Sequence, residues 1–336
     1  MREVSQGPRR GRSIVALTLL ALSAGVAGEA SSAASETRDW PSRPIRMIVP
    51  FAPGGGADLI ARVVSPRLSE RLGQTVVVDN RPAANGILGA ELAARAAPDG
   101  YTLLVPTSNY AAGPSLYAKL PYDLLRDFAP ITHAFSAPLV VTIHPSLPAQ
   151  NLKEFIAYAR ANRGKINFGH SGVGGPPHLA GELLSSMTGI NMTYVAYKGI
   201  GLVLTALLGN EVQITTPNML AAQPHVRSGR LRALGITSLK RSQAAPDWPT
   251  IAEEGLPGYE AGIWFGFLAP AKTPRPIVDR LHQEITAILN RPEIRQTLVA
   301  QGGDVVASTQ QEFAKLMRDD IERLGKLIRS AGIKAE

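Results

Sequence analysis

Two glycine-rich segments of the chain have the composition of anion-binding loops. The first is FAPGGGAD at residues 51–58, and the second is HSGVGGPPH at residues 170–178. Each lies between an apolar, β-rich run and a stretch with helical spacing, so free backbone N–H groups and a helix dipole would favour an anion there. The first loop alone is equally consistent with a tight turn that needs glycine for its φ angles. Its repetition in the second segment favours a binding role.

The first loop does not complete a nucleotide-binding fingerprint. Gly54, Gly56 and the later Asp79 are spaced as in dinucleotide-binding folds, but position 59 requires Gly or Ala and is Leu59. This loop also lacks the Lys-Ser/Thr pair of a phosphate-binding P-loop. The basic residues are scattered, so we expect no nucleic-acid partner either.

Enzymatic and metal chemistry have little support. The six histidines show no zinc-site spacing, and the chain has no cysteine, which excludes disulfides, Cys-ligated zinc and a thiol nucleophile. No G-x-S-x-G motif is present, although Ser171, flanked by His170 and Gly172, keeps an exported serine hydrolase as an alternative. We predict no catalytic residue, no metal and no cofactor, and hence that the protein is not an enzyme.

Both loops are set in alternating strand and helix patterns. We expect strands at 44–51, 74–79 and 101–107 with helices at 58–72 and 90–97 between them. The alternation restarts with strands at 139–143, 167–170, 193–196, 212–215 and 233–237 and helices at 151–162, 177–188, 201–208 and 221–228. An extended segment at 263–270 and helices at 275–289, 292–301 and 310–331 follow. This is an α/β pattern with strands covered by helices.

The final helices need a sheet to cover. We therefore expect the chain to return to its first sheet near residue 260, with residues 35–138 and 262–336 forming lobe 1, residues 139–261 forming lobe 2, and a ligand cleft between them.

Residues 1–34 have the pattern of a cleaved signal peptide. Arg9, Arg10 and Arg12 precede an apolar stretch at 13–27, and cleavage is expected after Ala30 or Ala34. About 15 apolar residues are too few for the roughly 20 that span a bilayer. We expect export by the general secretory route to the periplasm. The net charge of +8 includes four Arg and two acidic residues in this segment, which contribute +2 and leave +6 for the mature protein, a bias that would suit anionic solutes.

Ordered motifs along the mature chain resemble the Bug family of extracytoplasmic solute receptors, the binding components of tripartite tricarboxylate transporters. The motifs are WPSRPI at 40–45, VPFAPGG at 49–55, NRP at 80–82, APDGYTLL at 97–104, PSLY at 114–117, LPYD at 120–123, GVG at 172–174, HLAGE at 178–182, YKG at 197–199, RLRAL at 230–234, WFG at 264–266 and LAP at 268–270. The resemblance implies a two-lobed type II periplasmic-binding-protein fold, each lobe a mixed sheet covered by helices, that closes over a carboxylate.

The resemblance also implies ligand-binding positions. One carboxylate would be held by the two glycine-rich loops, at Phe51, Ala52, Pro53, Gly54, Gly55, Asp58, Ser171, Gly172, Gly174, Gly175 and His178. The rest of the ligand would be selected by Ser108, Asn109, Tyr197, Lys198, Gly199, Asn218 and Trp264.

Several positions are less polar than the family pattern. Gly175, Pro176 and Pro177 stand where a hydroxyl and extra polarity are usual, and Pro217 replaces the aspartate that commonly precedes Asn218. We hypothesise a ligand less polar than citrate, such as an aromatic or longer aliphatic carboxylate. The expected partners are that carboxylate and the permease subunits of a transporter, with a monomeric receptor. A sensor that presents its closed form to a signalling protein is the further alternative.

Overall fold

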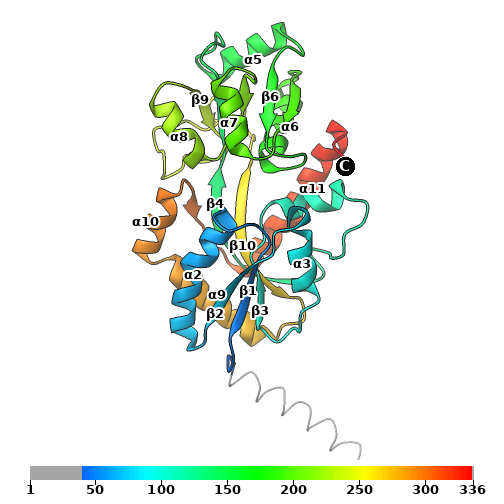
Figure 1. The fold of residues 1–336 in the computed structure, drawn as a ribbon, viewed down its shortest axis with the longest axis vertical. Helices are drawn as coiled ribbons and strands as arrows, with labels where there is room; N and C mark the ends of the chain where they lie inside the picture. Colours follow the sequence, from blue (N-terminus) through cyan, green and yellow to red (C-terminus); the bar gives the residue numbers. More distant parts are fainter. Residues whose placement is uncertain (1–39, 335–336) are drawn as a thin grey trace, which may run out of the picture. The chain divides into compact units, whose positions relative to one another are not determined.

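The computed structural model describes residues 40–334, so the predicted signal peptide and its cleavage site lie outside the described residues. All strands and helices below belong to the unit formed by Arg43–Glu336. They form two mixed sheets, one with strand order β11-β4-β10-β3-β1-β2 and one with order β7-β6-β8-β5-β9 (Figure 1). We call the parts built on them the first and second lobe.

The first lobe begins with the predicted alternation. β1 (Ile45–Val49), β2 (Val76–Asn80) and β3 (Thr102–Leu104) are parallel, and α2 (Gly56–Leu72) and α3 (Ile87–Ala94) connect them. Four of the five residues of β1 are buried, as expected for a strand in the middle of a sheet that helices cover on both faces. α2 ends where Gly73 adopts a left-handed conformation with φ 70°.

The last part of the chain completes this sheet. β10 (Gly262–Pro270) lies antiparallel to β3 and to β4 (Phe128–Pro138), and β11 (Asp304–Val305) pairs with β4. α9 (Arg275–Leu289), α10 (Pro292–Ala300) and α11 (Gln310–Ala331) follow β10 or β11. An ion pair between Arg71 and Glu284 joins α2 to α9. Figure 1 shows α2 and α9 on one side of the sheet, and α3 and α11 on the other side.

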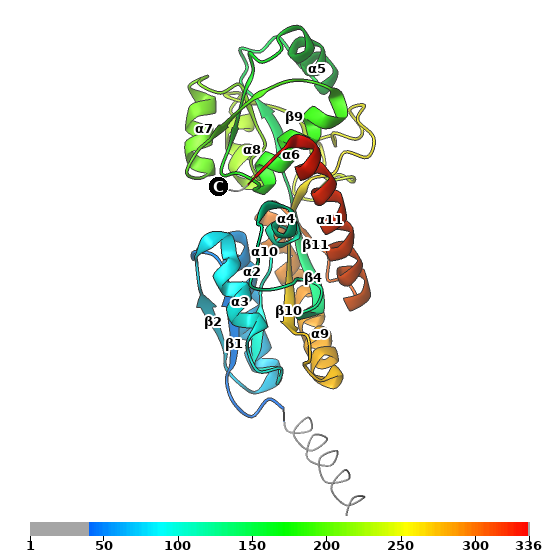
Figure 2. The same ribbon diagram turned by 90° about the vertical axis from the view of Figure 1, so that its right-hand side faces the viewer.

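The second lobe contains the restarted pattern. β5 (Val140–Ile143), β6 (Asn167–His170), β7 (Thr193–Ala196), β8 (Ile214–Thr215) and β9 (Arg232–Ile236) form its sheet. α5 (Leu152–Ala161), α6 (Pro176–Thr188), α7 (Ile200–Leu208) and α8 (Met219–Arg227) surround the sheet (Figure 2). The mixed sheets with covering helices confirm the predicted fold class. The exact lobe boundaries, 138/139 and 261/262, remain a prediction.

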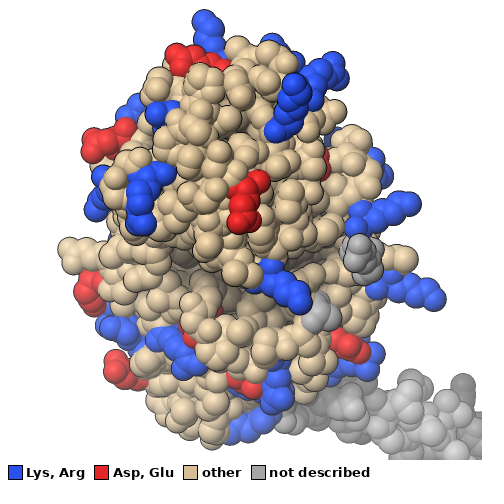
Figure 3. Space-filling view, turned by 45° about the horizontal axis from the view of Figure 1, so that its top comes forward, with Lys and Arg blue, Asp and Glu red and all other residues tan. Residues whose placement is uncertain are grey.

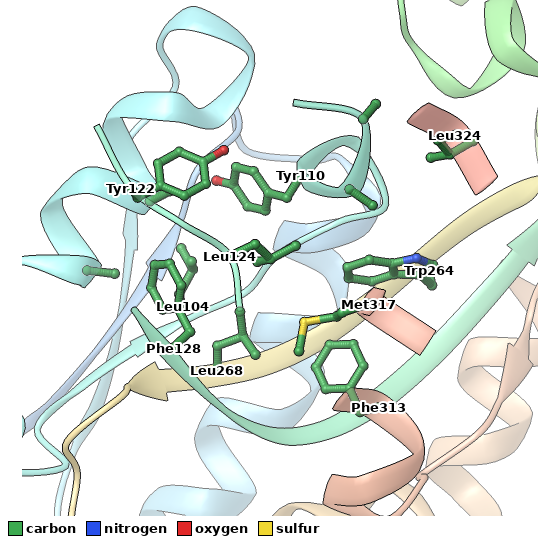
Figure 4. Close-up of a cluster of buried hydrophobic side chains, with 14 of the residues drawn as sticks. Leu104, Tyr110, Tyr122, Leu124, Phe128, Trp264, Leu268, Phe313, Met317 and Leu324 are labelled. Carbon is green, nitrogen blue, oxygen red and sulfur yellow. The ribbon is translucent and has the colours of Figure 1, made fainter. Parts of the chain in front are cut away.

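An apolar core ties α11 and the short helix α4 (Asn109–Leu116) to the first sheet. Trp264 of β10 packs edge-on against Phe313 of α11 with ring centroids 5.4 Å apart, and Tyr110 of α4 packs in the same way against Tyr122 (Figure 4). Burial of such rings contributes about 25 cal/mol per Å² of apolar surface removed from water. α11 itself begins with a capping box between Thr309 and Glu312.

The sequence patterns missed β4 and α4. β4 contains Pro130 and Pro138, which interrupt a strand pattern, and α4 contains the helix-disfavouring pair Gly113-Pro114. Tertiary packing overrides these local preferences, because β4 pairs with β10 along its whole length and α4 is buried at Tyr110 and its neighbours. Among residues 40–334, no helix has the length and apolarity to cross a membrane.

Candidate functional site

The first glycine-rich loop leads into α2 in the way the sequence predicted. Gly55 is the N-cap residue with φ −82°, no side chain caps the helix, and the first intrahelical bond runs from the Leu59 N–H to the Gly55 carbonyl at 2.9 Å. The N–H groups of the preceding helical residues therefore have no partner within the helix. Ala52, Pro53, Gly54 and Gly55 are exposed. This helix start can receive an anion.

Asp58 shapes this loop from the inside. Its buried carboxylate accepts hydrogen bonds from the Gly54 N–H at 3.0 Å, from Asn80 Nδ2 at 2.9 Å and from Arg62 Nε at 2.8 Å. Burial raises the pKa of Asp58, but the hydrogen bonds from Arg62, Gly54 and Asn80 outweigh it, and the net pKa lies below the ordinary value. Asn80 Nδ2 also donates to the Phe51 carbonyl at 3.1 Å. Asp58 is thus engaged by the protein's own donors.

In the second glycine-rich loop, several backbone N–H groups already have acceptors within the loop or in the histidines that flank it. The Gly174 N–H donates to His178 Nδ1 at 3.0 Å, the Gly172 N–H lies 3.3 Å from His170 Nδ1, and the Gly175 N–H donates to the Gly172 carbonyl at 3.3 Å. α6 then starts with Pro176 and Pro177, which have no N–H. The start of α6 therefore offers an anion fewer donors than the start of α2.

The His178 side chain is buried beneath this loop. It is only 6% exposed, and its Nε2 lies 3.4 Å from Glu182 Oε1. Its ring stacks on that of His170, and burial, together with the nearby His178, lowers the pKa of His170. Both rings support the loop: His170 Nδ1 lies 3.0 Å from the Gly172 carbonyl and 3.3 Å from the Gly172 N–H, and His178 Nδ1 accepts from the Gly174 N–H.

A cavity of about 180 Å³ lies where the second loop meets the first lobe. We call it the interlobe cavity; it is lined by Asn85, Ile87, Asn109, Tyr110, Gly113, Leu116, Tyr117, Tyr122 and Ser171 through Pro176. Of the predicted site residues, it brings together Asn109, Ser171, Gly172, Gly174 and Gly175. No Lys, Arg, Asp or Glu is among its lining residues.

The two lobes touch directly at this cavity. A Cβ atom added to Gly174 would lie 2.4 Å from Leu116 Cδ1, and Gly174 has φ +71°. The positive φ favours glycine at this position, and the close approach shows that the loop packs against the Leu116 side chain. The second loop therefore rests on α4, the helix that the sequence patterns missed.

Ser108 and Trp264 are buried in the protein and do not line the interlobe cavity. Ser108 is buried just before α4, with its N–H donating to the Trp264 carbonyl at 3.1 Å, and it lines a small void with Asn109. Trp264 is 5% exposed and its Nε1 donates to Asp320 Oδ2 at 2.6 Å. Trp264 lines a separate cavity of about 160 Å³ with His133 and Asp320.

The remaining predicted residues lie at helix starts of the second lobe. Tyr197 follows β7, with its N–H bonded to the His170 carbonyl at 2.9 Å, and Lys198 is exposed. Gly199 caps α7 with φ 112°. The side-chain oxygen of Asn218 accepts from the Ala221 N–H at 2.9 Å and so caps α8. None of these residues lines the interlobe cavity.

The structure adds Asn85, Leu116 and Tyr117 to the candidate site. The Asn85-Gly86 pair is a turn signal that predicts positive φ angles, and both residues have them, at 55° and 91°. Leu116 and Tyr117 belong to the PSLY motif at 114–117, but the motif did not indicate a binding role, because that role depends on α4 meeting the other lobe.

Most charged side chains in the face shown in Figure 3 lie toward the outline of the molecule, but an acidic side chain lies above the central hollow and a basic one lies beside it. Within residues 40–334, no group of three or more His, Cys, Asp or Glu side chains is placed to hold a metal ion. A ligand in the interlobe cavity would therefore be held by hydroxyl, amide and backbone groups.

Comparisons with known proteins agree on one family. A model described as "Tripartite tricarboxylate transporter family receptor" matches residues 60–333. The chain is 38% identical over 320 residues to "Protein BugT" of Bordetella pertussis, covering 95% of this chain and 98% of that one.

Two solved structures from Rhodopseudomonas palustris are also similar. One is Rpa4515 with adipate, at 35% identity and a TM-score of 0.76 over 88% of this chain and 100% of that chain. The other is MatC with bound malate, at 31% identity and a TM-score of 0.72 over 86% of this chain and 100% of that chain.

Proposed function

Because this chain belongs to the receptor family of the tripartite tricarboxylate transporters, we propose that it captures a small carboxylate between its lobes and delivers it to the permease subunits of such a transporter. Binding would shift the protein toward a closed form, since a ligand that contacts both lobes favours the state in which they meet. The lobes would comprise residues 35–138 with 262–336, and residues 139–261.

The interlobe cavity is the observation that carries this proposal. Its wall combines the second glycine-rich loop with Asn85, Asn109 and Tyr117 of the first lobe. A solute there would contact elements of both sheets and would be released when they separate. The start of α2, with its unpaired N–H groups, supplies a further place for a carboxylate group.

The ligand class we propose is an aliphatic dicarboxylate of about the length of adipate. Ile87, Leu116 and Pro176 give the cavity apolar wall, while prolines at the start of α6 remove donors that a highly charged acid would use. These features support a ligand less polar than citrate. The relative that holds adipate is in keeping with this choice.

We also propose that residues 1–34 direct export to the periplasm, where the mature chain acts as a monomer. The basic start, apolar stretch and small residues of this segment support export.

Binding without chemistry fits the surroundings of Ser171 better than hydrolysis does. His170 Nδ1 lies 3.0 Å from the Gly172 carbonyl and 3.3 Å from the Gly172 N–H, His178 Nδ1 accepts from the Gly174 N–H, and His178 Nε2 faces Glu182. The Nδ1 atoms of both rings are thus engaged by the loop backbone and not by the Ser171 hydroxyl, which does not support a Ser-His catalytic pair. We propose that the protein is not an enzyme and uses no cofactor.

The test is the thermal stability of residues 35–336 with a panel containing adipate, malate, citrate, benzoate and an amino acid. A ligand that binds only the folded protein stabilises it by about 2.7 kcal/mol at a hundredfold excess over Kd. We expect the largest rise in Tm with adipate and a smaller one with citrate. The absence of a shift with every carboxylate, in protein refolded to remove copurified ligand, would contradict the proposal. Ester turnover that Ser171→Ala abolishes would favour the hydrolase.

A further inference from the structure

Asn85 and Tyr117 form a hydrogen-bonded pair in the wall of the interlobe cavity, outside both glycine-rich loops. We propose that this pair binds the second carboxylate of an aliphatic dicarboxylate and thereby selects diacids over monoacids of the same length. The inference rests on the proposed function, because it specifies how the same cavity recognises its ligand.

The direction of the hydrogen bond between Asn85 and Tyr117 determines which of their hydrogens remain available to a ligand. Asn85 Nδ2 donates to the Tyr117 hydroxyl oxygen at 2.8 Å. The hydroxyl hydrogen of Tyr117 is then directed elsewhere, and the second amide hydrogen of Asn85 is also available as a donor. An ionised carboxylate only accepts hydrogen bonds, so it matches two donors side by side.

The backbone around Asn85 is held in a special conformation. Asn85 has φ 55° and ψ 29°, a left-handed conformation that few non-glycine residues adopt. The adjacent Gly86 carbonyl accepts a 2.7 Å hydrogen bond from the buried hydroxyl of Tyr110. This anchor in the core fixes the backbone next to Asn85, while the exposed Asn85 side chain is held at the cavity by its hydrogen bond to Tyr117.

The same segment lies against the first glycine-rich loop. A Cβ atom added to Gly86 would lie 3.2 Å from the ring of Phe51, which begins that loop. Phe51, which begins the first glycine-rich loop, therefore packs beside the Asn85–Tyr117 pair, although no residue of 51–58 lines the interlobe cavity itself. In the proposed complex the methylene chain of the diacid would lie against Ile87 and Leu116, and its other carboxylate would point toward the first loop.

Uncharged lining makes the pair more important for specificity. The cavity wall contains no basic side chain that could form an ion pair with the ligand. Hydrogen bonds to a charged group are stronger than neutral ones and contribute about 1.5–3 kcal/mol each. Loss of one such bond corresponds to roughly a 10- to 100-fold loss of affinity.

The experiment measures the affinities of adipate and hexanoate, which differ by one carboxylate, by titration calorimetry. The variants are Tyr117→Phe, which removes only the hydroxyl, and Asn85→Gly, which removes the amide but keeps a residue suited to positive φ. Tyr158→Phe in α5, which does not line the cavity, is the matched control. Far-ultraviolet circular dichroism and Tm show whether each variant is folded.

We expect each cavity variant to bind adipate 10- to 100-fold more weakly than the wild type, with hexanoate affinity unchanged and the control unaltered. Variants that keep the wild-type ratio of adipate to hexanoate affinity would overturn the role of the pair while leaving the receptor function intact. A wild-type protein that binds no dicarboxylate at all would overturn both proposals.

Discussion

The imidazole rings of His170 and His178 stack with centroids 4.2 Å apart and planes 13° from parallel. His170 ends β6 and His178 lies in the first turn of α6, so the stack joins the two elements that flank the second glycine-rich loop. Each ring also places its Nδ1 against the loop backbone, His170 against the peptide groups of Gly172 and His178 against the Gly174 N–H. The loop therefore has a rigid support that consists of two side chains.

The acceptor on His178 is the first feature to test. His178→Phe keeps an aromatic ring in the stack but leaves the buried Gly174 N–H without its partner, which costs about 1–3 kcal/mol. We expect the free energy of unfolding from urea titration to fall by that amount and carboxylate affinity to fall with it.

His225→Phe is a suitable control for that variant, because the buried Nδ1 of His225 has no hydrogen-bond partner in the described structure. It should change stability and binding far less. Equal losses in the two variants would show that ring size, and not the bond to Gly174, matters at position 178.

Asp58 allows a second prediction, about the first loop. Asp58→Ala removes the acceptor for the Gly54 N–H, for Asn80 and for Arg62, and we expect a loss of stability of about 2–4 kcal/mol because hydrogen bonds to a buried charge are strong. Since the folded pKa of Asp58 is lowered, its contribution is present above the ordinary pKa and is lost as pH falls through the folded value.

The control for Asp58 is Asp319→Ala. Asp319 forms an exposed ion pair with Lys315 one helical turn away, and such pairs contribute about 0–1 kcal/mol. Urea titrations at pH 7 compare the two variants. A loss as small as that of Asp319→Ala would mean that the loop keeps its shape without the Asp58 carboxylate.

Strong periodic patterns allowed much of the fold to be predicted. β6 and β7, and the helices α9 and α11, occur at the predicted residues, because their alternation or helical spacing agrees with the packing that surrounds them. β4 and α4 were missed for the opposite reason, since their prolines and glycine oppose the structure that long-range pairing imposes.

The site was predictable only in part. The strand-loop-helix setting of both glycine-rich loops follows from their sequence, but Asn85 and Tyr117 meet only through packing of segments 32 positions apart. The cap role of Asn218 could have been inferred, because asparagine directly before a helix is a preferred N-cap. The engagement of Asp58 by Gly54, Asn80 and Arg62 depends on β2 lying beside α2, which local patterns do not specify.

The substitution Gly55→Asp should affect ligand affinity and the stability of the fold in different ways. Gly55 has an extended φ of −82°, and an added Cβ would meet only the Ala52 carbonyl at an ordinary 3.8 Å. Gly55→Asp therefore fits and, as an acidic N-cap residue, stabilises α2. The same charge repels a carboxylate at the helix start, so we expect unchanged or higher Tm together with at least about a tenfold loss of adipate affinity.

Gly55→Asn has nearly the shape of that variant without its charge, and it should retain most of the affinity. Calorimetric titration of both variants decides the matter. Equal affinity of the Asp and Asn variants would show that no carboxylate binds at the start of α2.

The acid sensitivity of the first lobe should depend on His133. Its ring lies between the β4–β10 pair and α11, stacked on Phe313 with centroids 6.0 Å apart and bonded to Ser136 Oγ at 2.9 Å. Burial lowers the pKa of His133 to about 4, against weaker opposing effects of the Phe135 backbone and the Asp320 carboxylate. Folding therefore opposes its protonation.

The unfolded chain binds this proton at a pKa of about 6.5, so the stabilising effect of a neutral His133 is complete above that pH and declines as pH falls toward 4. Between pH 7 and pH 5 the loss amounts to about 2 kcal/mol. His133→Gln keeps a hydrogen-bonding group for Ser136 but does not titrate, and we expect it to reduce the pH dependence by that amount in urea titrations. His170, whose pKa is also lowered, would still contribute in the variant, and an unchanged slope would show that His133 does not determine the acid sensitivity.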